Sequence, residues 1–198
     1  MTEDPTLALD GRRQRSQRSR ERLLDAVEAV IAADGVISPE QIATKAGVSL
    51  STLFRHFGDM EGLAAEMRTR ASTRVDPLLT GRDFVGDRAT RVRELVRRRT
   101  AAFEAIAPLQ RAALRQPLRT PGARAAQQRL ETLLRDQLDA AIGRDFPVPH
   151  GDAARTLLRA LLGFETWNHL RVTQQLDTET ASRLLERGAL ALLAAALT

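Results

Sequence analysis

Cysteine is absent from the sequence, which excludes disulfide bridges, zinc–thiolate sites and thiol redox chemistry. The three histidines, His56, His150 and His169, are too far apart in sequence to have the spacing of metal ligands. The longest apolar run, residues 189–197, has nine residues, about half the length of a membrane-spanning helix. The N-terminus is polar and basic and has no signal-peptide core. We therefore expect a soluble, cytoplasmic protein without a metal, another cofactor or a membrane partner.

Lysine is nearly absent as well, because the basic side chains are one lysine, Lys45, and twenty-nine arginines. The net charge is +5, yet residues 1–70 carry ten basic and eleven acidic side chains. The local exception is residues 12–22, which hold six arginines and one acid. A basic segment of this kind suits a polyanion such as DNA, and it is equally typical of a solvated tail.

Strand-like alternation is missing too, and apolar residues recur at helical spacing along nearly the whole chain. The pattern predicts an all-α protein with a loose segment over residues 1–17. A capping serine, Ser38, followed by Pro39 and then Gln41, predicts the start of the second helix. The expected helices span residues 18–34, 39–46, 49–57, 60–79, 87–106, 108–116, 121–143, 152–174 and 178–197, separated by glycines, by prolines and by the loop at 80–87.

The second and third of these helices have the spacing of a helix-turn-helix. Ala43 is small where two helices must cross closely, and Gly47 follows four residues later at the turn. Leu53 lies six residues further on, where it points into the core with Ile42. This arrangement leaves the polar face of the third helix free for a DNA major groove.

The wider stretch resembles the TetR family of bacterial transcriptional regulators over residues 18–66. The similarity is carried by "RERLLDAVEAVIAADG" and by "IATKAGVSLSTLFRHFGDMEGL". It implies an all-α fold of about nine helices, in which an N-terminal three-helix helix-turn-helix headpiece precedes a larger helical ligand-binding and dimerisation domain. The implied domains are a flexible basic arm over 1–17, the DNA-binding domain over 18–66, and the effector-binding and dimerisation domain over 67–198.

The resemblance also implies which side chains contact a double-stranded DNA operator. Leu50 would meet a thymine methyl group, and Arg55 is able to bond guanine in a bidentate manner, although it also fits a solvated surface position. Phe54 replaces a common tyrosine, so packing in the core is an alternative role for it. The implied DNA-binding residues are Ser38, Lys45, Ser49, Leu50, Ser51, Thr52, Phe54, Arg55 and His56.

One departure from the family concerns Met60, where a lysine often begins the fourth helix and contacts phosphate. Asp59 and Glu61 beside it suit the positive end of a helix dipole but would repel phosphate. The basic arm offers a replacement anchor, and we assign that role to Arg12, Arg13 and Arg15.

The second domain would hold a small-molecule effector of unknown identity. Polar side chains on apolar helix faces can orient a ligand in a pocket. For Arg99 the alternatives are an internal ion pair with Glu165 or a guanidinium that reaches water. The residues expected to line the pocket are Arg99, Phe103, Phe164, Glu165, Trp167, Asn168 and His169.

The last helix carries an apolar stripe of small residues that permits close helix approach. We expect it to form a homodimer interface, so that two headpieces read the half-sites of a near-palindrome. The alternative is that this helix closes the core of the monomer. The interface residues are Leu185, Gly188, Leu192 and Ala195, in line with Ala181.

These features indicate a DNA-binding regulator, most simply a repressor that an effector releases from its operator. A regulator without an effector is the alternative, and solid packing of Arg99, Phe103 and Trp167 would favour it. Activation instead of repression is also compatible with the sequence. An enzyme is not expected, because the sequence has no catalytic cysteine, no phosphate-binding glycine loop and no Ser/His/Asp grouping outside the third helix.

Overall fold

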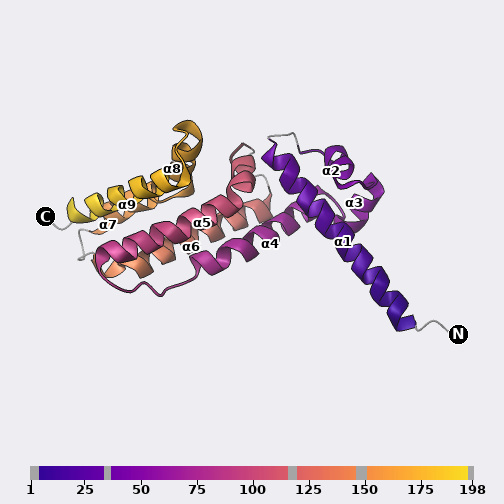
Figure 1. Ribbon diagram of the computed structural model, residues 1–198, viewed down its shortest axis with the longest axis horizontal. Helices are drawn as coiled ribbons and strands as arrows, with labels where there is room; N and C mark the ends of the chain where they lie inside the picture. Colours follow the sequence, from indigo (N-terminus) through magenta and orange to yellow (C-terminus); the bar gives the residue numbers. More distant parts are fainter. Residues whose placement is uncertain (1–4, 34–36, 116–119, 146–150, 196–198) are drawn as a thin grey trace. The chain divides into compact units, whose positions relative to one another are not determined.

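The computed structural model describes residues 5–33, 37–115, 120–145 and 151–195. Within these ranges the chain forms helices and no strands, so the predicted all-α fold is confirmed (Figure 1). None of the described helices is both long and apolar enough to cross a membrane. The α-helices are α1 (Pro5–Ala32), α2 (Pro39–Ala46), α3 (Leu50–Phe57), α4 (Met60–Leu79), α5 (Arg88–Arg115), α6 (Pro121–Ile142), α7 (Gly151–Leu161), α8 (Phe164–Asn168) and α9 (Thr178–Ala195).

Helix α1 starts earlier than the sequence predicts. The apolar stripe begins at Leu23, which is why residue 18 was the expected start, but the helix already begins at Pro5. Proline is favoured in the first turn of a helix, because its fixed φ is helical and its missing N–H would be unpaired there. Arg12, Arg13 and Arg15 therefore lie on a helix that continues into the headpiece.

Helix α5 passes through Pro108, where the sequence analysis places a break. A proline inside a helix removes one backbone hydrogen bond and costs about 3 kcal/mol or more. The residues beyond it offset this loss by burial, since Leu109 and Ala112 pack against the apolar core of the N-terminal part of the chain. The two helices predicted for residues 87–116 are thus one helix.

The single helix predicted for residues 152–174 is three segments. Helix α7 ends at Leu161, and Gly163 separates it from the short helix α8. The chain then continues as a π-helix over His169–Thr173. The backbone of Gly163 is extended, which ends α7, and a Cβ atom at this position would lie 3.1 Å from the carbonyl oxygen of Arg159, a close approach that favours glycine.

The chain divides into two compact units. The first contains residues 1–70 and 108–117, and the second contains residues 71–107 and 118–198. Compared with the expected boundary at 66/67, the C-terminal end of α5 joins the first unit. Helices α4 and α5 each begin in one unit and end in the other.

In the second unit α5, α6, α7 and α9 share the larger apolar core, and a smaller cluster joins α4 to α5. A buried ion pair closes one end of this core, where Arg91 Nη2 lies 2.5 Å from Asp145 Oδ2. The same guanidinium donates to the carbonyl oxygens of Ala141 and Gly86, each at 2.8 Å. Arg91 thereby joins α5 to the end of α6 and to the loop before α5.

Candidate nucleic-acid interface

Helices α2 and α3 form a helix-turn-helix whose ends are fixed by local hydrogen bonds. Ser38 Oγ accepts a hydrogen bond from Gln41 N at 3.2 Å and so caps α2. Helix α2 ends at Gly47, whose φ of 65° lies in the left-handed region that favours glycine. Ser49 Oγ accepts from Thr52 N at 3.3 Å and caps α3. The capping serines and the glycine turn that the sequence predicts are confirmed.

One face of α3 rests on the core of the first unit. Leu53 is fully buried and Phe57 nearly so, and both pack in the cluster that contains Ile42 of α2 and Leu23 of α1. Ala43 of α2 is buried as well. Leu53 points into the core with Ile42, as predicted, and the opposite face of α3 is turned to solvent.

The first turn of α3 presents a cluster of hydroxyl groups. Ser49 Oγ lies 2.9 Å from Ser51 Oγ and 3.0 Å from Thr52 Oγ1. Arg55 Nη2 donates to Thr52 Oγ1 at 3.4 Å, which brings the guanidinium to the same surface. Ser49, Ser51 and Arg55 are exposed, and Thr52 is half-buried. Hydroxyl groups at the positive end of a helix dipole, with a cation one turn further along the helix, suit a phosphate backbone.

His56 lies beside this cluster in a half-buried position. Its ring centroid is 6.2 Å from that of Phe57. Burial, and then the charges of Arg55 and Arg20, lower the pKa of His56 below its ordinary value of 6.5. The imidazole is therefore neutral at pH 7 and can donate one hydrogen bond to an anion.

The remaining predicted residues of this region differ in exposure. Lys45, in the last turn of α2, is exposed, and Ser38 is half-buried. Leu50 and Phe54 are 38% and 37% exposed, so Phe54 does not belong to the core. The helix-turn-helix thus brings all nine predicted residues of α2, α3 and their caps into one small region of the first unit.

The segment "GDMEG" joins α3 to α4, and four of its five positions have a structural explanation. Gly58 ends α3 with a φ of 77°, and Asp59 Oδ1 accepts from Gly62 N at 2.8 Å. Met60 packs against the core of the first unit, which accounts for an apolar side chain at this position. A Cβ atom on Gly62 would lie 2.0 Å from the carbonyl oxygen of Phe57, so no larger residue fits there.

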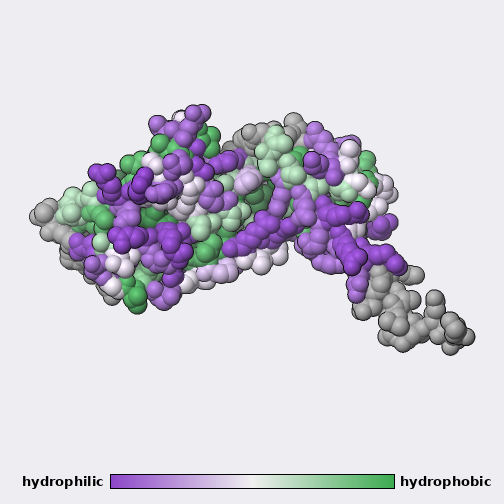
Figure 2. All heavy atoms as spheres, viewed as in Figure 1, coloured by the Kyte–Doolittle hydropathy of each residue, from purple (hydrophilic) through white to green (hydrophobic). Residues whose placement is uncertain are grey.

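Three arginines of the basic arm are exposed on α1, namely Arg15, Arg18 and Arg22. They are three and four residues apart, so they lie on one side of the helix. The side chains of Arg12 and Arg13 lie outside the described residues. Figure 2 shows strongly hydrophilic side chains along the visible face of α1.

Arg20 has a different role from these neighbours. Its guanidinium carbon lies 5.7 Å from the centre of the Phe57 ring, and it pairs with Glu66 of α4. This arginine therefore stabilises the first unit.

In the second unit, three of the predicted pocket residues form a buried aromatic cluster. Phe103, Phe164 and Trp167 are all at most 3% exposed. The ring centroids of Phe103 and Phe164 are 5.6 Å apart in an edge-to-face arrangement, and Trp167 lies 5.8 and 5.6 Å from the two. Trp167 Nε1 is buried and finds no hydrogen-bond acceptor among the described residues. An unpaired buried donor is unusual and costs about 1–3 kcal/mol.

Arg99 lies in the same core and is 3% exposed. Its Nε donates to Gln137 Oε1 at 3.1 Å, its Nη1 to the carbonyl oxygen of Leu162 at 2.8 Å, and its Nη2 to that of Leu134. Burial lowers the pKa of Arg99 to about 9, so the group remains charged at pH 7. The contacts of Arg99 join α5 to α6 and to Leu162, the residue that follows α7, and an ion pair with Glu165 is not among them.

Gln137, which the sequence analysis missed, links Arg99 to α4. The amide is fully buried, and its Nε2 donates to the carbonyl oxygen of Leu78 at 2.8 Å. The available signal was an amide three residues after Leu134 and four before Ala141, on a face of α6 that is otherwise apolar.

The other three predicted pocket residues lie outside the buried cluster. Glu165 and His169 are exposed, and Asn168 is half-buried. His169 Nε2 lies 3.3 Å from Gln174 Nε2, within the π-helical segment and its end. The structure therefore brings together Arg99, Phe103, Phe164 and Trp167, and leaves these three at the surface.

The predicted interface stripe on α9 is turned partly inward. Leu185 is 3% exposed, as part of the core of the second unit. A Cβ on Gly188 would lie 3.1 Å from Leu161 Cδ2, so this glycine permits close approach of α7 and α9 within one chain. Leu192 is half-buried and Ala195 is exposed.

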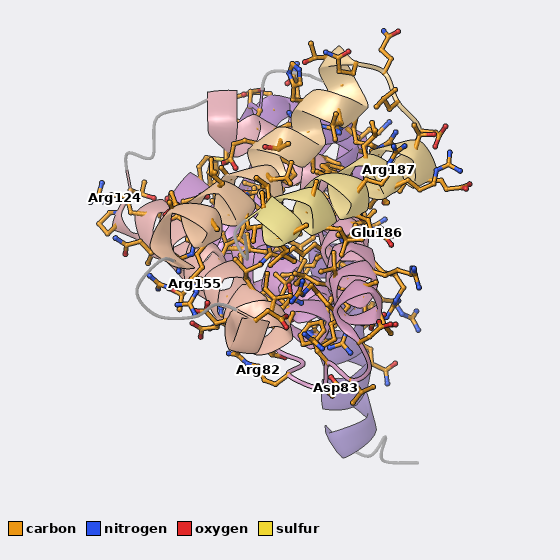
Figure 3. All side chains as sticks on the ribbon, turned by 90° about the vertical axis from the view of Figure 1, so that its left-hand side faces the viewer. Arg82, Asp83, Arg124, Arg155, Glu186 and Arg187 are labelled. Atoms are coloured by element: carbon orange, nitrogen blue, oxygen red, sulfur yellow. The ribbon has the colours of Figure 1, made fainter. Side chains whose placement is uncertain are left out.

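The neighbouring flank of α9 carries exposed apolar residues that the sequence analysis missed. Leu184 is 45% exposed, and Leu157 of the adjacent helix α7 is 54% exposed. Next to this flank, Figure 3 shows Glu186 and Arg187 on α9. Glu186 pairs with Arg93 of α5 at 3.3 Å. The sequence pattern could not separate the two flanks, because leucine and alanine occur on both.

Residues 23–67 match the family model of the bacterial regulatory proteins, tetR family. No curated protein matches the chain. Among solved structures, a protein described as a TetR-family transcriptional regulator from Mesorhizobium loti MAFF303099 is 23% identical, with a TM-score of 0.65. The alignment covers 91% of this chain and 98% of that chain.

Two further solved structures are similar over most of their length. A transcriptional regulator from Rhodococcus sp. Rha1 is 18% identical with a TM-score of 0.67, covering 89% of this chain and 96% of that chain. NalD, the secondary repressor of the MexAB-OprM multidrug efflux pump in Pseudomonas aeruginosa, is 22% identical with a TM-score of 0.57, covering 88% and 96%. At these identities the likeness shows the fold.

Proposed function

We propose that the protein is a repressor that binds a near-palindromic operator. The premise is that the chain belongs, through its N-terminal domain, to the tetR family of bacterial regulatory proteins and has the fold of its transcriptional regulators. The observation that carries the proposal is the surface of α3, where the exposed Ser49, Ser51 and Arg55 and the half-buried Thr52 form one polar cluster above a buried Leu53. The protein acts in the cytoplasm, and by binding instead of catalysis.

In this proposal the two sides of the α3 surface have different tasks. The hydroxyl groups and the imidazole of His56 bind phosphate and set the position of α3 in the major groove. Arg55 reads a base edge, for which guanine is the best partner. Two headpieces of a homodimer would contact two half-sites about one helical turn of DNA apart.

The test is selection of binding sequences from random double-stranded DNA by the purified full-length protein, followed by footprinting. We expect a near-palindrome that the protein prefers over scrambled DNA by about 10³-fold or more at physiological salt. Selection that returns no sequence preference would contradict the proposal. A reporter gene placed behind the selected operator then distinguishes repression from activation.

Release by a small molecule is the second part of the proposal. Trp167 Nε1 supports it, because a ligand acceptor would satisfy this buried donor. The hydrogen-bonded chain from Arg99 through Gln137 to Leu78 also supports it, since α4 begins in the headpiece unit. A ligand that changes these contacts would shift α4 and lower the affinity for DNA. Linkage then requires DNA to weaken ligand binding by the same factor. NalD, whose fold is similar, is a repressor.

A regulator without an effector is a second candidate, and one observation favours it. Arg99, Phe103 and Trp167 are buried, each at most 3% exposed. Trp167 is the only tryptophan of the chain, so its fluorescence reports this site alone. A screen of small molecules for changes in this fluorescence, with hits retested for operator release, separates the candidates. Molecules that change the fluorescence and weaken operator binding together establish release, and a binder that leaves operator affinity unchanged contradicts it.

A further inference from the structure

The core of the second unit contains a buried cation without a buried anion. Arg99 is 3% exposed, and its guanidinium bonds only neutral acceptors, one side-chain amide and two backbone carbonyls. No carboxylate pairs with it in the part of the chain that the structure describes, and burial alone lowers its pKa. A charge removed from water is costly unless an opposite charge compensates it. Arg99 therefore lacks one negative charge.

Arg91 gives the comparison within the same unit. It is the one other charged side chain that is buried among the described residues, at 5% exposed. Its Nη2 lies 2.5 Å from Asp145 Oδ2, so its charge is compensated by a carboxylate of the chain. The sequence thus supplies an anion to one of its two buried arginines and leaves the other without one.

The same region has too few hydrogen-bond acceptors. A guanidinium has five N–H groups, and the three bonds of Arg99 use one on each nitrogen. One N–H on Nη1 and one on Nη2 therefore have no acceptor among the described residues. Trp167 Nε1 is a third buried donor without an acceptor there. Buried donors are nearly always paired, so three of them in one region call for acceptor oxygens.

These donors belong to one cluster. Arg99 and Phe103 are one turn apart on α5 and share a face of that helix. Arg99 also bonds the carbonyl oxygen of Leu162, two residues before Phe164. The Phe103 and Phe164 ring centroids are 5.6 Å apart, and Trp167 packs against both rings. The unpaired cation and the unpaired indole N–H thus lie on either side of buried aromatic rings.

The chain is irregular where this cluster comes closest to solvent. The guanidinium carbon of Arg171 lies 5.8 Å from the centre of the Trp167 ring, and the Arg171 side chain is 24% exposed. Arg171 belongs to the π-helix at His169–Thr173, a form of helix that is rare and often found at functional sites. Gln175 follows with a φ of 53°, which is uncommon for a residue other than glycine. Movement of this segment would open a path to Trp167.

We propose that Arg99 and Trp167 form the binding site of a small organic acid, a carboxylate attached to an aromatic body. The single charge of a carboxylate neutralises Arg99, and its two oxygens match the fork of the guanidinium. The aromatic body packs among the rings of Phe103, Phe164 and Trp167. A phosphate ester, with a charge of about −2, would leave one negative charge buried without a partner. The inference rests on the proposed release by a small molecule and names the chemical class of that molecule.

The test titrates the full-length protein with benzoate, phenylacetate, cinnamate and naphthoate, each compared with its own primary amide at pH 7. The amide has nearly the same shape as the acid and carries no charge. The fluorescence of Trp167, the only tryptophan, and the thermal unfolding midpoint report binding. We expect at least one acid to bind saturably and about tenfold or more tightly than its amide.

Variants locate the site on the protein. Arg99→Gln should bind the acid and its amide about equally, whereas Arg99→Lys should keep a preference for the acid. Trp167→Phe keeps a ring and removes the N–H, so calorimetry should show weaker binding of the acid. The matched control is Arg187→Gln, an exposed arginine of α9 (Figure 3), which should leave the affinity for the acid unchanged.

The unaltered protein decides the question even if the Arg99 variants do not fold. Equal affinity for every acid and its amide, or no saturable binding of any of the four acids, overturns the inference. Equal weakening by Arg187→Gln and Arg99→Gln also overturns it, because acids would then bind through the general positive charge.

Operator affinity with and without the tightest acid separates this inference from the function on which it rests. Acid binding that depends on Arg99 and leaves operator affinity unchanged supports the site and contradicts the proposed release. Acid binding that depends on Arg99 and weakens operator binding supports both.

Discussion

Gly62 is the residue on which the start of α4 depends. Its Cα approaches Phe57 so closely that an added Cβ would lie 2.0 Å from a carbonyl oxygen. Backbone cannot give way as a flexible side chain does, so Gly62→Ala should displace the first turn of α4. We expect the variant to lose about 1–3 kcal/mol of stability, as overpacked sites do.

Thermal unfolding followed by circular dichroism measures this effect, with Gly143→Ala as the matched control. Gly143 is helical, and its nearest neighbour would be Asp139 Cβ at an ordinary 3.8 Å. The control should be as stable as the unaltered protein or slightly more so, because alanine restricts the unfolded chain. Equal midpoints for both variants would show that the contact at Gly62 does not limit the fold.

His56 makes the affinity for DNA depend on pH. In the free protein, the pKa of His56 is lowered by burial and then by the charges of Arg55 and Arg20. A bound phosphate favours the charged imidazolium and raises the pKa again, so the complex takes up a proton. The affinity for DNA should therefore increase as the pH falls from about 8 to about 5. The increase should occur between the pKa of His56 in the DNA complex and its lower pKa in the free protein.

Fluorescence anisotropy with labelled operator measures this dependence at constant ionic strength. His56→Gln keeps a hydrogen-bond donor but does not titrate, so its affinity should vary less with pH. The role of His56 would be contradicted by identical pH profiles for the two proteins.

At the scale of elements, the exposed face of α1 should act through charge alone. Arg15, Arg18 and Arg22 lie on one side of a helix that is continuous with the headpiece. If they contact phosphates, replacing all three with glutamine should weaken binding to every DNA sequence. The slope of log affinity against log salt should fall by about 0.9 for each lost contact.

Substitution is a sharper experiment than deletion of residues 1–17, because deletion would remove nearly half of α1. Arg183→Gln is the control, an exposed arginine of the second unit that pairs with Glu179 at 3.1 Å. If the triple glutamine variant has the same salt slope as the unaltered protein, the arm does not replace the phosphate contact that is missing at Met60, and its proposed role is contradicted.

Elements whose ends are set by local chemistry were predictable from the sequence. Helices α2, α3 and α4 begin where Ser38, Ser49 and Asp59 cap them, within one residue of expectation. The errors occur where distant packing overrides a local signal. Pro108 does not end α5, because Leu109 beyond it is partly buried and packs against another part of the chain.

At the scale of the whole molecule, the exposed apolar flank of α7 and α9 is the candidate dimer surface. Leu157 and Leu184 are 54% and 45% exposed on adjacent helices, with Ala191 and Ala195 exposed along the same flank. A twofold dimer would bury each of these residues against the partner. Leu184→Asp should therefore produce monomers and lower the affinity for a palindromic operator.

Light scattering after size exclusion measures the mass, with Arg183→Asp as the control, one residue earlier and about 100° round α9 from Leu184. The control should remain a dimer. If the Leu184→Asp protein stays dimeric, the dimer interface lies elsewhere on the surface. Leu185 cannot form that interface, since its side chain is buried within one chain.

The two units differ in how far the sequence predicts their sites. The headpiece site is a single short segment, so local spacing brings its residues together. The second site is assembled from four helices, and Arg99 meets Gln137 and Leu162 only after the chain has folded. A single sequence shows that Arg99 and Trp167 lie on apolar faces. It does not show that Arg99 bonds Gln137 while Trp167 Nε1 finds no acceptor among the described residues.

The central claim is that α3 reads DNA through Arg55. The direct measurement compares the affinities of the unaltered protein and of Arg55→Ala for the selected operator and for scrambled DNA at one salt concentration. Loss of a bidentate guanine contact should weaken operator binding by roughly 1–3 kcal/mol, about 5- to 150-fold. Binding to scrambled DNA should change far less. Equal operator affinity of the two proteins would contradict the account.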